Sequence, residues 1–178
     1  NQVSSALLKN GKPSSRTMVM KYLSLPIVHL CQPVSLRTYL KMTLKHSRLN
    51  IAELSDVHLG HNKTSASHIV KNLYRAFPDN EITGELDIIW IAGDLFDSLL
   101  NLPSESVSEI TKWATHFLKL CKKRDIVLRV LEGTPSHDWQ QAKLLVDINE
   151  HADIGADINY IQELSIDYIE RFVIHIID

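Results

Sequence analysis

The chain has 178 residues, of which 44% are hydrophobic and 22% charged, and its formal net charge is −2. These values fit one globular domain that is large enough to bury a core without covalent cross-links. The two cysteines exclude a disulfide framework and a cysteine-rich zinc module, and no apolar run approaches the roughly 18–20 residues of a membrane span.

The N-terminal part differs in charge from the rest. Residues 1–50 contain eight Lys or Arg and no Asp or Glu, which leaves 11 basic and 21 acidic residues for the remainder. We interpret residues 1–48 as a basic leader that is disordered or not native to the domain, because acid-free, Ser-rich segments are typical of transit peptides. Two alternatives stay open: an arm that contacts phosphates, and an integral structural element. Residues 18–30 are apolar enough to form a short element.

From residue 49 onward, strands and helices alternate in the predicted structure. Apolar segments with β-branched residues predict three strands, at 49–55, 86–92 and 126–131. Helical periodicity predicts helices at 65–77, from a capping box of Ser106 and Glu109 to Cys121, at 139–150 and at 161–169. A last apolar run, at 172–177, predicts a truncated strand. This order predicts an α/β layered sheet with right-handed crossovers.

The three predicted strands each end in candidate metal ligands. These are Asp56 and His58, then Asp94 and Asp97, then His137 and Asp138. The carboxyl ends of neighbouring strands meet at one edge of an open α/β sheet, so these groups can converge. Each motif alone is more often a turn or a helix cap, but three on successive strands favour a site. Carboxylates and imidazoles suit Mn²⁺, Fe²⁺ or Zn²⁺.

The series D-x-H, G-D-x-x-D and a glycine turn with His-Asp resembles the calcineurin-like metallophosphoesterases. Segments 55–61, 91–97 and 132–139 are most similar to the nuclease subunit of SbcCD-type recombination complexes, in its bacteriophage versions. The resemblance covers residues 49–178. It implies a layered β-sandwich with flanking helices, of which this chain holds the N-terminal part only. It also implies a metal-dependent phosphodiester hydrolase, a DNA exonuclease or endonuclease that acts in recombination and repair.

The resemblance also implies two divalent ions, with Mn²⁺ as the first expectation and Fe²⁺ or Zn²⁺ as alternatives. Asp56 and Asp94 would bridge the ions, and His58 would bind the first. Where the family has an asparagine ligand, this chain has 134-TPS-136, so Ser136, or Thr134, would supply the oxygen. A hydroxyl is a weaker ligand than an amide carbonyl, and this difference concerns the second ion.

By the same resemblance, His137 is the general acid that protonates the leaving oxygen, and Asp97 is the carboxylate that orients it. The later histidine motifs of the family do not follow. After His137 only His151 and His175 remain, which we interpret as a helix C-terminal residue and a strand residue. The chain therefore resembles a domain that is incomplete at its C-terminus.

Two hypotheses follow for function. The first is a cytoplasmic nuclease with DNA as substrate, an ATPase subunit as partner through the resemblance, a homodimer as an allowed assembly, and no membrane contact. The second is a catalytically incomplete fragment, or a binding module of the same fold. The basic segment 119–124 predicts a helix end that complements the helix dipole, with a DNA contact as the alternative.

Overall fold

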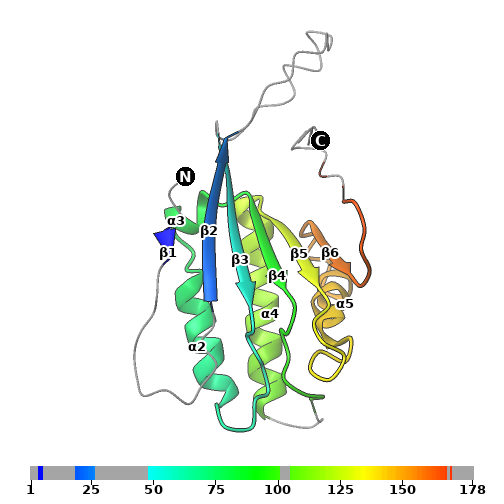
Figure 1. The fold of residues 1–178 in the computed structure, drawn as a ribbon. Helices are drawn as coiled ribbons and strands as arrows, with labels where there is room; N and C mark the ends of the chain where they lie inside the picture. The colour runs from blue at the N-terminus through cyan, green and yellow to red at the C-terminus, as the bar shows by residue number, and fades with distance from the viewer. Residues whose placement is uncertain (1–3, 6–18, 27–47, 101–104, 168, 170–178) are drawn as a thin grey trace.

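The computed structural model describes residues 4–5, 19–26, 48–100, 105–167 and 169. Within these residues, six strands form one sheet in sequence order. They are β1 (Ser4–Ser5), β2 (Val19–Pro26), β3 (Arg48–Ser55), β4 (Ile88–Ala92), β5 (Val127–Leu131) and β6 (Ile158–Ile161). Strands β3 to β6 are parallel, whereas β1 and β2 are antiparallel to their neighbours. The four parallel strands all point toward the lower edge of the molecule in Figure 1.

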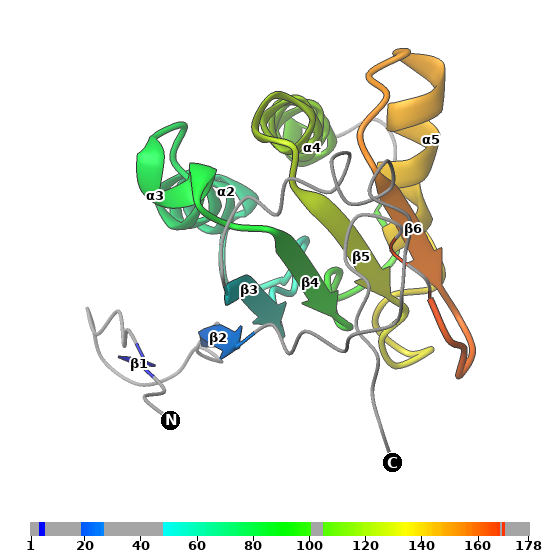
Figure 2. The same ribbon diagram turned by 90° about the horizontal axis from the view of Figure 1, so that it is seen from above.

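Helices connect the parallel strands. They are α2 (Ala66–Ala76), α3 (Glu81–Gly84), α4 (Glu105–Arg124), a 3-10 helix (Gln141–Lys143) and α5 (Leu144–His151). Figure 2 shows α2, α4 and α5 on the same face of the sheet. The structure therefore confirms the predicted α/β class with a parallel sheet and flanking helices. Within the described residues all strands belong to this one sheet, so the β-sandwich that the resemblance implies remains a prediction.

The core lies between the sheet and its helices. The helix-facing side chains of the central strands are all buried: Ala52, Leu54, Ile89, Ile91, Leu128 and Val130. Helix α4 presents Trp113, Phe117 and Leu118 to them, and Phe117 also packs against Phe77 after α2. The opposite face of the sheet carries a smaller buried cluster of Leu49, Ile51, Ile88 and Val127, against which Ile169 packs. Because strand side chains alternate between faces, the apolar runs supply both clusters.

Several predicted boundaries are confirmed by local chemistry. Ser65 caps α2, since its hydroxyl accepts a hydrogen bond from the amide of His68 at 3.2 Å. Phe77 ends the helix just before Pro78. The strands predicted at 49–55, 86–92 and 126–131 correspond to β3, β4 and β5 within two residues at either end. Among the described residues no helix combines the length and hydropathy that a bilayer span requires.

Other expectations are wrong or fall elsewhere. Ser106 does not cap a helix, because α4 already begins at Glu105. The helix expected from residue 139 starts later, at Gln141, since residues 139 and 140 have positive φ angles. The helix expected at 161–169 is wrong: residue 161 ends β6, and 162–167 contain no helix. The strand expected at 172–177 and residue His175 lie outside the described residues.

The segment 1–48 contributes to the sheet. Strand β2 pairs with β3 over its whole length, from Val19 opposite Ser55 to Pro26 opposite Arg48. Strand β2 lies within the stretch 18–30 whose apolar character predicts a short element. This pairing is what the alternative of an integral structural element requires, whereas the division of the chain at residue 48 remains a prediction.

Candidate metal centre

The loops after β3 and β4 lie side by side and have unusual backbone conformations. The amide of His58 donates to the carbonyl of Asp94 at 3.1 Å, and that of Leu59 donates to Leu95 at 2.8 Å. Asp56, His58 and Asp94 have φ angles of 54°, 53° and 50°. Residues other than glycine rarely adopt this left-handed region, and such strained residues cluster at functional sites. The conformation turns these side chains away from the direction that a continued strand would give them.

Three candidate ligands converge at this edge of the sheet. His58, Asp94 and His137 each offer one ligand atom, and these atoms lie within 4.8 Å of one another. The imidazole rings of His58 and His137 have their centroids 5.0 Å apart. His58 is 4% exposed, and the other two side chains are partly buried. Two imidazoles and a carboxylate form a ligand set that suits Zn²⁺, Fe²⁺ or Mn²⁺. The three residues come from three different strand ends, as the sequence predicts.

Asp94 is held by the loop after β5. Its Oδ1 accepts hydrogen bonds from the backbone amide of Thr134 at 2.8 Å and from the Thr134 hydroxyl at 3.0 Å. Its Oδ2 lies 3.1 Å from Nδ1 of His137. Burial raises the pKa of Asp94, but the hydrogen bonds from Thr134 and His137 outweigh it and leave the pKa below its usual value. The carboxylate is therefore ionised and oriented, as a metal ligand needs to be.

Asp138 joins the loop after β5 to the loop after β4. It is fully buried, and its two carboxylate oxygens accept hydrogen bonds from the amides of Phe96 at 2.8 Å and Gly133 at 2.6 Å. Burial raises the pKa of this carboxyl group despite those hydrogen bonds, and the nearby charge of Asp94 raises it further. The sequence predicts Asp138 as a candidate ligand, or as part of a turn and helix cap. Its anchoring role depends on a contact 42 residues away, to Phe96, which no local pattern reveals.

Gly133 is required by the close approach of these loops. A Cβ atom placed on it would lie 2.1 Å from the Asp94 amide nitrogen and 2.6 Å from Oδ2 of Asp138. Gly93, on the neighbouring strand end, has a φ angle of 84°. The glycines before Asp94 and Thr134 thus serve different purposes. The first permits a left-handed turn, and the second leaves room for the neighbouring chain.

The remaining predicted site residues lie around the cluster. Oδ1 of Asp97 lies 2.9 Å from Nδ1 of His58, and Oδ1 of Asp56 lies 3.6 Å from Nε2 of the same ring. The side chain of Asp56 is half-exposed. Ser136 is exposed, and its carbonyl accepts a hydrogen bond from the Trp139 indole at 3.1 Å. Of the two residues considered for the hydroxyl ligand, Thr134 is the one hydrogen-bonded to Asp94.

One expected pairing is different in the structure. Asp97 was expected beside His137, but it contacts His58, whereas Asp94 contacts His137. The physical reason is the pairing of the two loops. The amide of Asp97 donates to the carbonyl of Leu59 at 2.9 Å, which brings the carboxylate next to residue 58. A carboxylate behind a histidine ring is the usual arrangement for a metal-binding imidazole.

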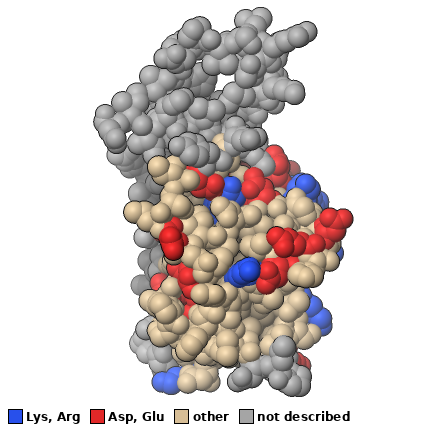
Figure 3. Space-filling view, turned by 90° about the vertical axis from the view of Figure 1, so that its right-hand side faces the viewer, with Lys and Arg blue, Asp and Glu red and all other residues tan. Residues whose placement is uncertain are grey.

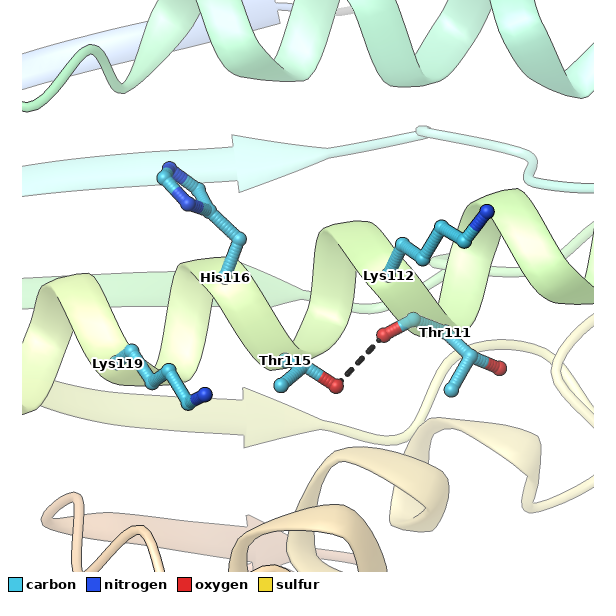
Figure 4. A pocket seen from close by; sticks show the side chains of 5 residues that line it. All are labelled: Thr111, Lys112, Thr115, His116 and Lys119. Carbon is cyan, nitrogen blue, oxygen red and sulfur yellow. Dashed lines mark hydrogen bonds between the residues drawn. The ribbon is translucent and has the colours of Figure 1, made fainter.

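A surface hollow along α4 is a poorer candidate for a site. Figure 4 shows that its lining comes from this single helix, and the lining residues are Thr111, Lys112, Thr115, His116 and Lys119. The Thr115 hydroxyl donates to the Thr111 carbonyl at 2.8 Å, and the His116 ring packs against Tyr74. Among the residues that the structure describes, no carboxylate lines the hollow, so it lacks the ligand set found at the strand ends.

Two other expectations concern basic groups. His151 is the last residue of α5, as predicted, and its ring contacts the carbonyl of Asp147 at 2.7 Å. The basic end of α4 lies at the opposite end of the sheet from the cluster (Figure 1). There Lys123 and Arg124 both contact Asp79, at 2.6 Å.

Comparison with models of protein families, with curated proteins and with solved structures gives no match to this chain. The resemblance to the calcineurin-like metallophosphoesterases therefore rests on the three sequence motifs.

Proposed function

We propose that the chain is a metal-dependent phosphodiester hydrolase, and specifically a nuclease that acts on DNA. The observation that supports this proposal is the convergence of His58, Asp94 and His137 from three successive strand ends, with ligand atoms within 4.8 Å of one another. Each of the three comes from one of the motifs that resemble metallophosphoesterases. A coincidental turn or helix cap would not require the three motifs to meet.

The residues present fit a divalent ion. His58 would bind through Nε2, since its Nδ1 lies beside Asp97 and its Nε2 faces Asp56. Asp94 would add an ionised carboxylate whose other oxygen is fixed by Thr134. A bound divalent ion supplies Lewis-acid chemistry, by which water is activated and charge on a phosphate is offset. We propose Mn²⁺, with Fe²⁺ and Zn²⁺ as alternatives. A second ion would share Asp56 and Asp94 with the first and would take its hydroxyl ligand from Ser136 or Thr134.

His137 has two proposed roles that differ in outcome. As general acid, its imidazolium would donate a proton to the leaving oxygen, and the contact with Asp94 at 3.1 Å would orient the ring. As a ligand, it would complete the set of His58 and Asp94 instead. Removing the ring should leave the metal affinity unchanged if His137 is the general acid and should lower it if His137 is a ligand.

The distribution of charged side chains restricts the part of the surface to which a DNA substrate could bind. Figure 3 shows that acidic side chains gather on the side formed by α5 and β6, which disfavours contact with phosphates there. The basic end of α4 lies at the far end of the sheet and is partly neutralised by Asp79. The substrate would therefore approach the edge formed by the loops after β3, β4 and β5. A cytoplasmic role in recombination and repair, an ATPase partner and a homodimer belong to the same proposal.

A second candidate function is that of a fragment or binding module with an incomplete site. One observation favours it: Asp56 and Ser136, proposed for the second ion, are exposed and lie outside the compact cluster. Metal stoichiometry separates the two candidates. A complete site would bind two ions per chain, whereas an incomplete one would bind one ion weakly or none.

The test is Mn²⁺-dependent hydrolysis of linear duplex DNA and of bis(4-nitrophenyl) phosphate by the whole chain. Asp94→Asn should abolish the activity, because the amide has no negative charge to offer a metal ion. Asp79→Asn is the matched control: it removes an exposed carboxylate at the opposite end of the sheet and should leave the activity unchanged. Activity that persists in Asp94→Asn would refute the proposed site.

A further inference from the structure

Trp139 is an exposed aromatic residue beside the candidate metal centre. Trp139 follows His137 by two positions in the sequence, and Trp139 is 59% exposed. Its indole nitrogen donates to the carbonyl of Ser136 at 3.1 Å, so the ring folds back over the turn that carries His137. Tryptophan is a large apolar residue that is usually mostly buried, and this exposure next to a site calls for an explanation.

The backbone that presents this ring is strained and fixed. Trp139 and Gln140 have φ angles of 47° and 61°, a conformation that L-residues rarely adopt. On one side the segment is anchored by the buried carboxylate of Asp138, which binds the amides of Phe96 and Gly133.

On the other side the segment is anchored by Gln141. Its amide group donates to the carbonyl of Ser98 at 2.9 Å and accepts from the amide of Leu100 at 2.7 Å. Two strained residues between two anchors form a rigid support that holds the indole in one place. Strained backbone of this kind persists where the surrounding structure enforces it, often at ligand-binding sites.

We propose that Trp139 is a platform on which a base of single-stranded nucleic acid stacks while the adjoining phosphate lies at the metal centre. This inference rests on the proposed function and names the feature of the substrate that the site selects. Every base has an aromatic face, so a rigid exposed indole binds nucleic acid with little dependence on sequence. The ring keeps its N–H bound to Ser136, which leaves its face for the ligand.

The proposal can be tested by binding, without turnover. A fluorescein-labelled oligothymidylate and an oligomer of equal length with abasic sites are titrated into the whole chain with EDTA, and anisotropy gives the affinities. Trp139→Ala should bind the oligothymidylate about 5- to 150-fold more weakly than the wild type, because one stacked base is lost. Trp139→Phe should retain part of the affinity. Trp90→Phe is the matched control, since Trp90 is also exposed, at 40%, but lies on the sheet. All variants should bind the abasic oligomer equally weakly.

Tryptophan fluorescence gives a second readout. Oligothymidylate should quench the emission of the wild type and of Trp90→Phe. Trp139→Phe should lose the quenching, since Trp113 is buried and Trp90 lies within β4. Equal oligothymidylate affinities for the wild type and Trp139→Ala, equal affinities of the wild type for both oligomers, or no binding at all would overturn the proposal. The hydrolase proposal fails separately, if Mn²⁺-dependent activity is absent or survives Asp94→Asn.

Discussion

Replacing Gly133 by alanine should damage the metal centre through a steric overlap that the structure specifies. The new Cβ would lie 2.1 Å from the amide nitrogen of Asp94, 2.3 Å from its Oδ1 and 2.6 Å from Oδ2 of Asp138. Real Cβ atoms are not found this close to other heavy atoms, so the loops after β4 and β5 must separate. Overpacking costs about 1–3 kcal/mol. We expect Gly133→Ala to lower the free energy of unfolding by about 3 kcal/mol, the upper end of that range. Rigid backbone atoms are involved, and the hydrogen bond from Gly133 to Asp138 is disturbed as well.

The assay is urea unfolding together with calorimetric titration of Mn²⁺. Misplacing Asp94 should lower the affinity for Mn²⁺ by about 10- to 100-fold, as for other changes behind a metal ligand. Gly84→Ala is the matched control. The atoms nearest to a Cβ there belong to the Arg124 side chain, the first at 3.2 Å, which can shift more easily than backbone, and alanine favours the helix α3. Its free energy of unfolding should stay unchanged or rise by up to about 1 kcal/mol. If Gly133→Ala matched this control in stability and Mn²⁺ affinity, the reasoning about the close approach would be refuted.

Three further predictions concern single side chains. His137→Ala should reduce turnover by about 10²–10⁴-fold if His137 is the general acid. In that case its Mn²⁺ affinity, measured by calorimetry, should equal that of the wild type. Unchanged turnover would exclude the role of general acid. The pKa of Asp94 is lowered, so its contribution to stability is present above the usual value of 3.8 and is lost as the pH falls through the lowered pKa. The stability gap between wild type and Asp94→Asn in urea should therefore narrow at acidic pH, and a constant gap would contradict this account. Burial raises the pKa of Cys121 to about 12, so in Cys31→Ser this thiol should react with a disulfide reagent at pH 8 only after unfolding. Rapid labelling of the folded variant would show that Cys121 is accessible.

Local patterns predicted the part of the fold whose structure depends on nearby residues. The cap at Ser65 and the stop before Pro78 define α2 from adjacent residues alone. The run 86–92 identifies β4, because a strand buried on both faces needs continuous apolar residues. The segment 161–169 has apolar residues at helical spacing, yet residue 161 ends β6 through pairing with Leu131 of β5. That pairing partner lies 30 positions away, and a pattern within one segment cannot reveal it.

The candidate site shows the same division. Asp56, His58, Asp94 and His137 were found because they follow predicted strands, and the parallel sheet brings the last three together. The pairing of Asp97 with His58 was missed, since it depends on the register between two loops. The buried contacts of Asp138 and the strained backbone at Trp139 were missed for a related reason. Both arise from the fit of the loops after β4 and β5 around each other, and each loop alone has the sequence of an ordinary turn.

The most direct measurement is the binding of Mn²⁺ to the whole chain. Calorimetry and the electron paramagnetic resonance of the free ion both monitor this binding. The wild type should bind at least one ion, and His58→Ala and Asp94→Asn should each weaken this binding at least about tenfold, because each removes a ligand from the cluster. Asp79→Asn should bind as the wild type does. Equal Mn²⁺ binding by all four proteins, or none by the wild type, would contradict the account that the three strand ends form a metal centre.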